Sequence, residues 1–100
     1  MEYFESGHLR VAYVDTGSGT PVMLLHCSSA SHKEWNKLTE HLVKNYRVAA
    51  PDLIGYGESE RLNNMNFDPY ADVNMIINLA NILNEPFHMV GHSYGGAMAL

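Results

Sequence analysis

The residues best suited to chemistry lie late in the sequence, in the segment Gly91-His92-Ser93-Tyr94-Gly95. This segment has the G-x-S-x-G pattern, which places a serine on a sharp turn between a strand and a helix. A serine hydroxyl is a weak nucleophile unless it is held exposed beside a general base, and such a turn pushes the side chain out above the sheet. The pattern predicts Ser93 as a nucleophile. The alternative is a glycine-rich turn that only packs strand against helix.

Three short apolar runs supply the strands that this turn needs. They are residues 21–26 (PVMLLH), 47–50 (RVAA) and 87–90 (FHMV), each bounded by turn residues or proline. Continuous runs of this length are typical of strands covered on both faces, as in a parallel sheet. The third run leads directly into Gly91, so Ser93 is expected at the carboxyl end of a buried strand. Ahead of these runs, residues 10–14 alternate only weakly.

Two helices are predicted between these strands. Ser31 and Glu34 form a capping-box pattern ahead of apolar residues at helical spacing, which indicates a helix over residues 31–44. Asp68 followed by Pro69 is typical of a helix start, and this second helix is expected to end at Asn84. Its predicted apolar face consists of Val73, Ile76, Ile77, Ala80 and Leu83. Strands alternating with helices predict an α/β fold, with a mostly parallel sheet and helices on both faces.

Composition and charge narrow the function classes. With 46% hydrophobic and 17% charged residues, the chain has the makeup of a globular domain. A net charge of −5 with scattered basic residues argues against nucleic acid and anionic membrane surfaces as partners. No apolar run is long enough to span a membrane, the N-terminus has no basic signal region, and Cys27 is the single cysteine. These features favour a reducing, cytoplasmic setting and a small-molecule partner, and they leave the oligomeric state open.

No cofactor or metal is predicted. The G-x-G-x-x-G signature is missing, and Ala97 stands where a phosphate-binding lysine would follow the glycines. No group of carboxylates occurs at the spacing of a metal-ligand motif. Cys27 has no basic neighbour in sequence to lower the pKa of its thiol, which favours a partly buried loop cysteine over a reactive one.

Two further segments accompany the serine motif. His26-Cys27 ends the first apolar run, and a D-x-x-G-x-G-x-S pattern extends from Asp52 to Ser59 after the second. In this order, the three motifs resemble those of the α/β-hydrolase family, which usually has glycine where Cys27 stands. The resemblance covers residues 11–100 and implies that residues 1–100 are the N-terminal part of a single α/β-hydrolase domain, without its later strands and cap.

The resemblance also implies an oxyanion hole. Its donors would be the backbone N–H groups of Tyr94, which follows the nucleophile, and of Ser28, which follows the His26-Cys27 pair. Because a β-carbon at position 27 restricts positive φ, Cys27 remains an alternative donor to Ser28. His26 would support the oxyanion loop, and the Asp52 carboxylate would serve a structural role by accepting hydrogen bonds from loop amides.

The general base is expected outside these residues. In the family, the triad acid and histidine follow later strands, in the order serine, acid, histidine, which places them beyond Leu100. His88 lies within a predicted strand, and His92 is adjacent to Ser93 and is expected to point away from it.

The predicted function is that of a serine hydrolase. The substrate would be a carboxylic ester or related acyl compound, which forms an acyl-enzyme on Ser93. Serine at this position argues against the dehalogenase and epoxide hydrolase branches, whose family mechanism uses a carboxylate nucleophile. The open alternatives are hydrolysis of carbon–carbon, amide or peptide bonds, perhydrolysis, and a non-catalytic binding module that keeps the fold.

Overall fold

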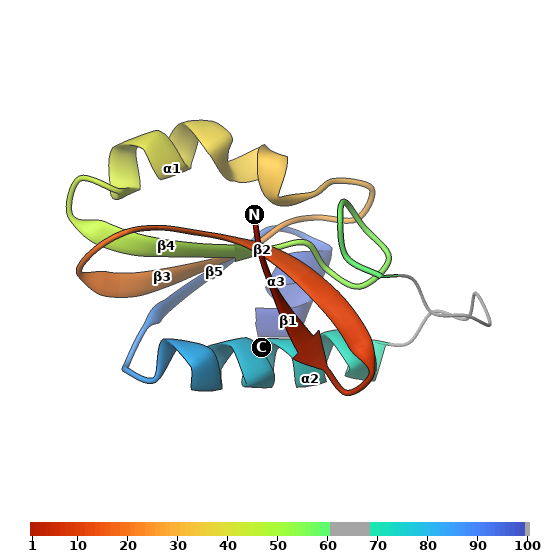
Figure 1. The fold of residues 1–100 in the computed structure, drawn as a ribbon. Helices are drawn as coiled ribbons and strands as arrows, with labels where there is room; N and C mark the ends of the chain where they lie inside the picture. The colour runs from red at the N-terminus through yellow and green to blue at the C-terminus, as the bar shows by residue number, and fades with distance from the viewer. Residues whose placement is uncertain (61–68, 100) are drawn as a thin grey trace.

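The computed structural model of the chain describes residues 1–60 and 69–99. Over these residues the strands form one mixed sheet, with helices on both of its faces (Figure 1). The strands are β1 (Glu2–Ser6), β2 (Leu9–Gly17), β3 (Thr20–Leu25), β4 (Tyr46–Pro51) and β5 (His88–Gly91). The helices are the 3-10 helix η1 (His32–Trp35) and the α-helices α1 (Asn36–Leu42), α2 (Pro69–Leu83) and α3 (Tyr94–Ala99).

The sheet has the strand order β1-β2-β4-β3-β5. β3 pairs in parallel with both β4 and β5, so the three predicted strands form the parallel part of the sheet. β1 and β2 form an antiparallel hairpin, and β2 also pairs antiparallel with β4. This hairpin was not predicted, because most of β1 is exposed and its residues carry little apolar signal.

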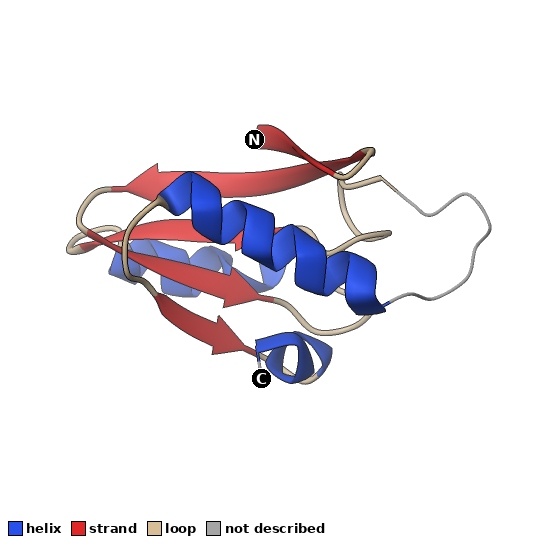
Figure 2. Cartoon of the chain, turned by 90° about the horizontal axis from the view of Figure 1, so that it is seen from below, coloured by secondary structure: helices blue, strands red, loops and turns tan. Residues whose placement is uncertain are grey.

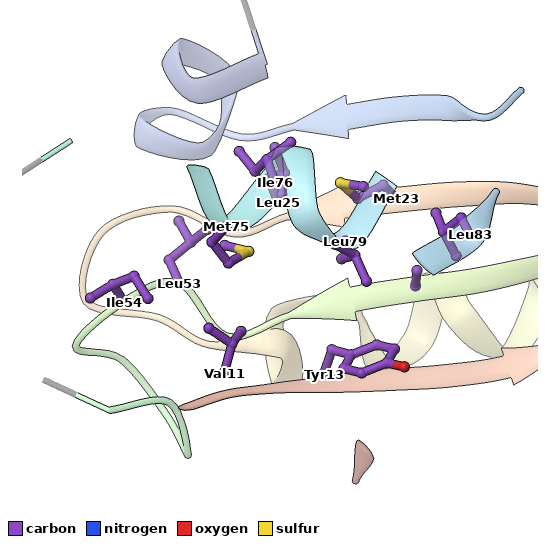
Figure 3. Close-up of a cluster of buried hydrophobic side chains, with 11 residues drawn as sticks. Val11, Tyr13, Met23, Leu25, Leu53, Ile54, Met75, Ile76, Leu79 and Leu83 are labelled. Carbon is purple, nitrogen blue, oxygen red and sulfur yellow. The ribbon is translucent and has the colours of Figure 1, made fainter. Parts of the chain in front are cut away.

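The apolar run of β3 is buried on both faces of the sheet. Met23 and Leu25 belong to a cluster of buried side chains that includes Met75 and Leu79 of α2 (Figure 3). This cluster lies on the face of the sheet that is lower in Figure 1. Figure 2 shows α2 running across this lower face of the sheet. Val22 and Leu24 belong to a second cluster on the opposite face, with Trp35 and Leu42 packed against it. Because β3 is buried on both faces of the sheet, its sequence is continuously apolar and does not alternate between apolar and polar residues.

Helix α2 begins at Pro69 and is followed by Asn84, whose φ of 54° ends the helix as predicted. The predicted N-cap, Asp68, lies outside the described residues. The predicted apolar face was wrong in part, because Val73 and Ile77 are exposed. The buried residues of α2 are Asp72, Met75, Ile76, Leu79 and Leu83.

The predicted helix over residues 31–44 is divided into η1 and α1, which ends at Leu42. Ser31 caps η1, because its Oγ accepts a hydrogen bond from the Lys33 N–H at 3.2 Å. The carboxylate of Glu34 does not complete the capping box. It accepts instead from the Cys27 N–H at 2.9 Å.

The loop after β4 continues the pairing of β2 beyond the end of β4. The Asp52 N–H donates to the Ala12 carbonyl oxygen, and the Glu60 N–H donates to the Arg10 carbonyl oxygen, each at 2.9 Å. Between them, the Ser59 Oγ accepts from the Ala12 N–H at 2.9 Å and donates to the Asp52 carbonyl oxygen at 2.6 Å. This part of the loop therefore satisfies backbone groups of β2 that β4 does not reach.

Within residues 1–60 and 69–99, no helix combines the length and the apolar character needed to cross a membrane.

Candidate active site

Ser93 lies on the turn that connects β5 to α3, and the residue is exposed to solvent. Its φ is 56°, in the left-handed region that a non-glycine residue adopts at a cost of about 1–3 kcal/mol. Two backbone hydrogen bonds at 3.1 Å hold this turn, from the His92 N–H to the Leu25 carbonyl oxygen and from the Gly95 N–H to the His92 carbonyl oxygen. The surrounding structure therefore imposes the strained conformation that holds the serine at the surface.

The two glycines of the motif are required by close packing. A Cβ added at Gly91 would lie 2.5 Å from the Gly95 carbonyl oxygen, and one added at Gly95 would lie 2.3 Å from the Leu25 carbonyl oxygen. In both cases the contact is with backbone, which cannot rotate away. Strand β5, helix α3 and the end of β3 can approach this closely only because both side chains are hydrogen atoms.

The side chain of Tyr94 is anchored beneath the turn. Its hydroxyl donates to the Asp72 carboxylate at 2.6 Å, and the same carboxylate accepts from the Ile54 N–H at 2.8 Å. Asp72 is only 2% exposed, so these hydrogen bonds explain a carboxylate on the buried face of α2. Sequence reasoning missed Asp72, because an acidic residue in an apolar helix is normally assigned to the solvent side.

The loop after β3 forms a turn over residues 27–30. The Ala30 N–H donates to the Cys27 carbonyl oxygen at 3.3 Å, and the left-handed residue of this turn is Ser29, with a φ of 64°. Cys27 has no positive φ, so the expected conflict between its β-carbon and the loop geometry does not arise. Its N–H is directed at the Glu34 carboxylate, and Ser28, the next residue, is exposed.

His26 joins the loop after β3 to the loop after β4. The ring is fully buried, its Nε2 accepts from the Leu53 N–H at 2.9 Å, and its Nδ1 lies 2.7 Å from the Cys27 carbonyl oxygen. These partners assign the neutral tautomer with hydrogen on Nδ1, which donates to that carbonyl. The expected supporting role of His26 agrees with these contacts.

Asp52 organises the loop that follows β4. Its buried carboxylate accepts from the His32 N–H at 2.7 Å and from the Glu58 N–H at 2.9 Å, and it lies 2.8 Å from the His32 Nδ1. A Cβ at Gly57 would lie 2.3 Å from one carboxylate oxygen, which explains the glycine there. The Asp52 side chain thus serves the loop structure, as expected.

Glu34 connects the loop after β3 to the turn that carries Ser93. One carboxylate oxygen accepts from the Cys27 N–H, and the other contacts the Nδ1 of His92. Partial burial disfavours the charged form of Glu34, but the Cys27 N–H and His92 outweigh it and lower the pKa of this carboxyl. Partial burial and a hydrogen bond to the same carboxylate raise the pKa of the Cys27 thiol. The sequence did not predict this cluster, because Glu34 also fits a local capping box.

Within residues 1–60 and 69–99, no hydrogen bond joins the Ser93 hydroxyl to a histidine or an acid. His92 contacts Glu34, while His26 and His32 are engaged with the two loops. The described residues thus bring together the serine turn and the loop after β3 but supply no base for the serine.

This arrangement of strands, turn and loops is that of a known family of enzymes. The profile of the α/β hydrolase fold matches residues 20–100, and the chain belongs to this family. The fold class and the family predicted from the motifs are both confirmed.

Curated relatives agree with this assignment. The chain is 32% identical over 96 residues to 2-hydroxymuconate semialdehyde hydrolase of a Pseudomonas species, a match covering 92% of this chain and 34% of that protein. It is 35% identical over 91 residues to a soluble epoxide hydrolase of a Corynebacterium species, covering 90% of this chain and 32% of that protein. The chain thus spans about a third of the length of these relatives.

Solved structures of the family superpose closely on the chain. A variant of a meta-cleavage product hydrolase matches with a TM-score of 0.87 and 34% identity, covering 98% of this chain and 38% of that one. A thioesterase domain from the curacin biosynthetic pathway matches with a TM-score of 0.91 and 27% identity, with the same coverage of 98% and 38%.

Proposed function

We propose that Ser93 is the nucleophile of a serine hydrolase that cleaves carboxylic esters or related acyl compounds. The observation that carries this proposal is the exposed serine held at a φ of 56° between two glycines that admit no side chain. A strained conformation of this kind persists only where the surrounding packing maintains it, which is typical of functional sites. The serine also distinguishes this chain from family branches that use a carboxylate at this position.

In the proposed reaction, the Ser93 Oγ attacks the carbonyl carbon and forms a tetrahedral intermediate. Collapse of the intermediate expels the alcohol and leaves an acyl-enzyme, which water then hydrolyses to the acid and free Ser93. The base that accepts the serine proton and the acid that orients it are expected beyond Leu100.

The backbone N–H groups of Tyr94 and Ser28 are proposed to stabilise the oxyanion. Of the two candidates after β3, Ser28 is favoured over Cys27, because the Cys27 N–H already donates to Glu34 at 2.9 Å. Each such donor contributes about 3 kcal/mol in the transition state. The Glu34 carboxylate and His26 would then hold the loop in position from its two sides.

Carbon–carbon bond hydrolysis is the second candidate, and the relatives favour it. Two of them are named for 2-hydroxymuconate semialdehyde and 2-hydroxy-6-oxo-2,4-heptadienoate. Neither name describes an ester or an amide, so hydrolysis of such a compound must break a carbon–carbon bond. The same nucleophile and oxyanion donors would serve, because the attacked group is again a carbonyl.

The proposal is tested by labelling the full-length protein with a fluorophosphonate probe. The control variant is Ser18→Ala, because Ser18 is an exposed serine in the turn between β2 and β3. We expect this variant to be labelled as strongly as the wild type. The Ser93→Ala variant is expected to lose the label. Absence of labelling in a folded wild type would contradict the proposal and favour a non-catalytic binding module. A screen of ester and conjugated oxo-acid substrates then separates the two candidate reactions.

A further inference from the structure

Three side chains that can bind metals converge beside the Ser93 turn. They come from separate places in the sequence: Cys27 from the loop after β3, Glu34 from η1, and His92 from the turn after β5. The thiol sulfur, a carboxylate oxygen and an imidazole nitrogen all lie within 4.8 Å of one another. The fold brings together residues that are far apart in sequence, so these three residues do not form a recognisable metal-binding sequence motif.

We propose that Cys27, Glu34 and His92 form a binding site for a thiophilic divalent cation, with Zn²⁺ as the best fit. Thiolate, imidazole and carboxylate are the ligand types that Zn²⁺ takes in proteins, whereas Mg²⁺ and Ca²⁺ require oxygen ligands. Three protein ligands leave the fourth tetrahedral position for water.

The geometry needs only a small adjustment to accept the ion. Metal–ligand distances of about 2.0–2.3 Å place tetrahedral ligand atoms about 3.3–3.8 Å apart. Because the three atoms lie within 4.8 Å of one another, no pair has to approach by more than about 1.5 Å, while the Glu34 oxygen and the His92 Nδ1, which are already in contact, have to separate. The His92 side chain is 58% exposed, so its rotation meets little resistance from packing.

Glu34 is suited to keep its structural contact while it binds the ion. One of its oxygens accepts from the Cys27 N–H, and the other, now in contact with His92, is the one available to a metal. A ligating carboxylate that is also held by a backbone hydrogen bond is oriented in advance, which favours binding. Binding would exchange the Glu34–His92 contact for two bonds to the same ion.

The test is direct measurement of Zn²⁺ binding to the full-length protein by competition with a chromophoric chelator. We expect one Zn²⁺ per chain, not displaced by excess Mg²⁺. The variants Cys27→Ser, Glu34→Gln and His92→Asn are each expected to weaken the Zn²⁺ affinity at least ~10-fold. Loss of a residue that only orients a metal ligand already has an effect of this size, and loss of the ligand itself should have at least as large an effect. The matched control is His41→Asn, at an exposed histidine of α1, which should bind as wild type does.

A second measurement needs no variant to remain folded. Co²⁺ added to the wild type should produce the charge-transfer absorption of a cobalt–thiolate bond. Absence of this band, or Zn²⁺ affinity unchanged in the three variants, would overturn the proposal. Ser93→Ala should bind Zn²⁺ normally, so the metal site and the proposed hydrolase activity are tested independently.

Discussion

Replacing Gly95 with alanine tests the packing on which the serine turn depends. The added Cβ would lie 2.3 Å from the Leu25 carbonyl oxygen and 2.5 Å from the His26 carbonyl oxygen, about 1 Å inside ordinary contact. Both are backbone atoms, so α3 must move away from the end of β3. Overpacking of this kind costs typically ~1–3 kcal/mol, and a rigid backbone neighbour favours the upper end of that range.

Gly96 provides a matched control in the same helix. A Cβ there would have as its nearest neighbour the Gly91 carbonyl oxygen at 3.5 Å, which is an ordinary contact. Neither glycine has a positive φ, so alanine introduces no backbone strain, and both substitutions gain up to about 1 kcal/mol of helix propensity. We therefore expect Gly95→Ala to lose about 2 kcal/mol and Gly96→Ala to gain up to about 1 kcal/mol.

The assay is urea unfolding of the two full-length variants and the wild type, compared by midpoint at constant m-value. The two variants should differ by about 3 kcal/mol in the free energy of unfolding. Fluorophosphonate labelling should fall in Gly95→Ala, whose serine turn is displaced, and persist in Gly96→Ala. Two variants with the same unfolding midpoint would refute the argument that backbone contact at Gly95 positions the turn.

Two other substitutions test the buried carboxylates. Asp52→Asn should lower the free energy of unfolding by about 3 kcal/mol, because a neutral amide replaces a charged acceptor of two backbone N–H groups; a loss below about 1 kcal/mol in urea unfolding would speak against this role. Tyr94→Phe removes the hydroxyl that donates to Asp72 at 2.6 Å and should cost about 1–3 kcal/mol. Calorimetric melting of this variant checks the second expectation, and an unchanged Tm would show that the hydroxyl does not stabilise the fold.

Features with a local or strongly periodic cause were predictable from the sequence. The continuous apolar run of β3 identified a strand buried on both faces, and the end of α2 predicted at Asn84 coincides with the residue whose φ is 54°. The G-x-S-x-G pattern predicted a sharp turn between strand and helix at Ser93, and the backbone contacts at Gly91 and Gly95 explain why only glycine fits there.

Features that depend on distant partners were not predictable. Asp72 is buried because Ile54 and Tyr94 supply donors from other elements, so this acidic residue lies on the buried face of α2. Glu34 matched a local capping box, yet its carboxylate contacts Cys27 and His92 instead. In each case a tertiary hydrogen bond outweighed the local pattern.

The loop that follows β4 also bears on aggregation. Beyond the end of β4, β2 would present unpaired N–H and C=O groups, and such an edge can recruit a strand from another molecule. The loop occupies this stretch instead, through the bonds from Asp52 to Ala12 and from Glu60 to Arg10. A segment whose glycines and aspartate shape a turn thereby also blocks intermolecular strand addition at this part of the sheet.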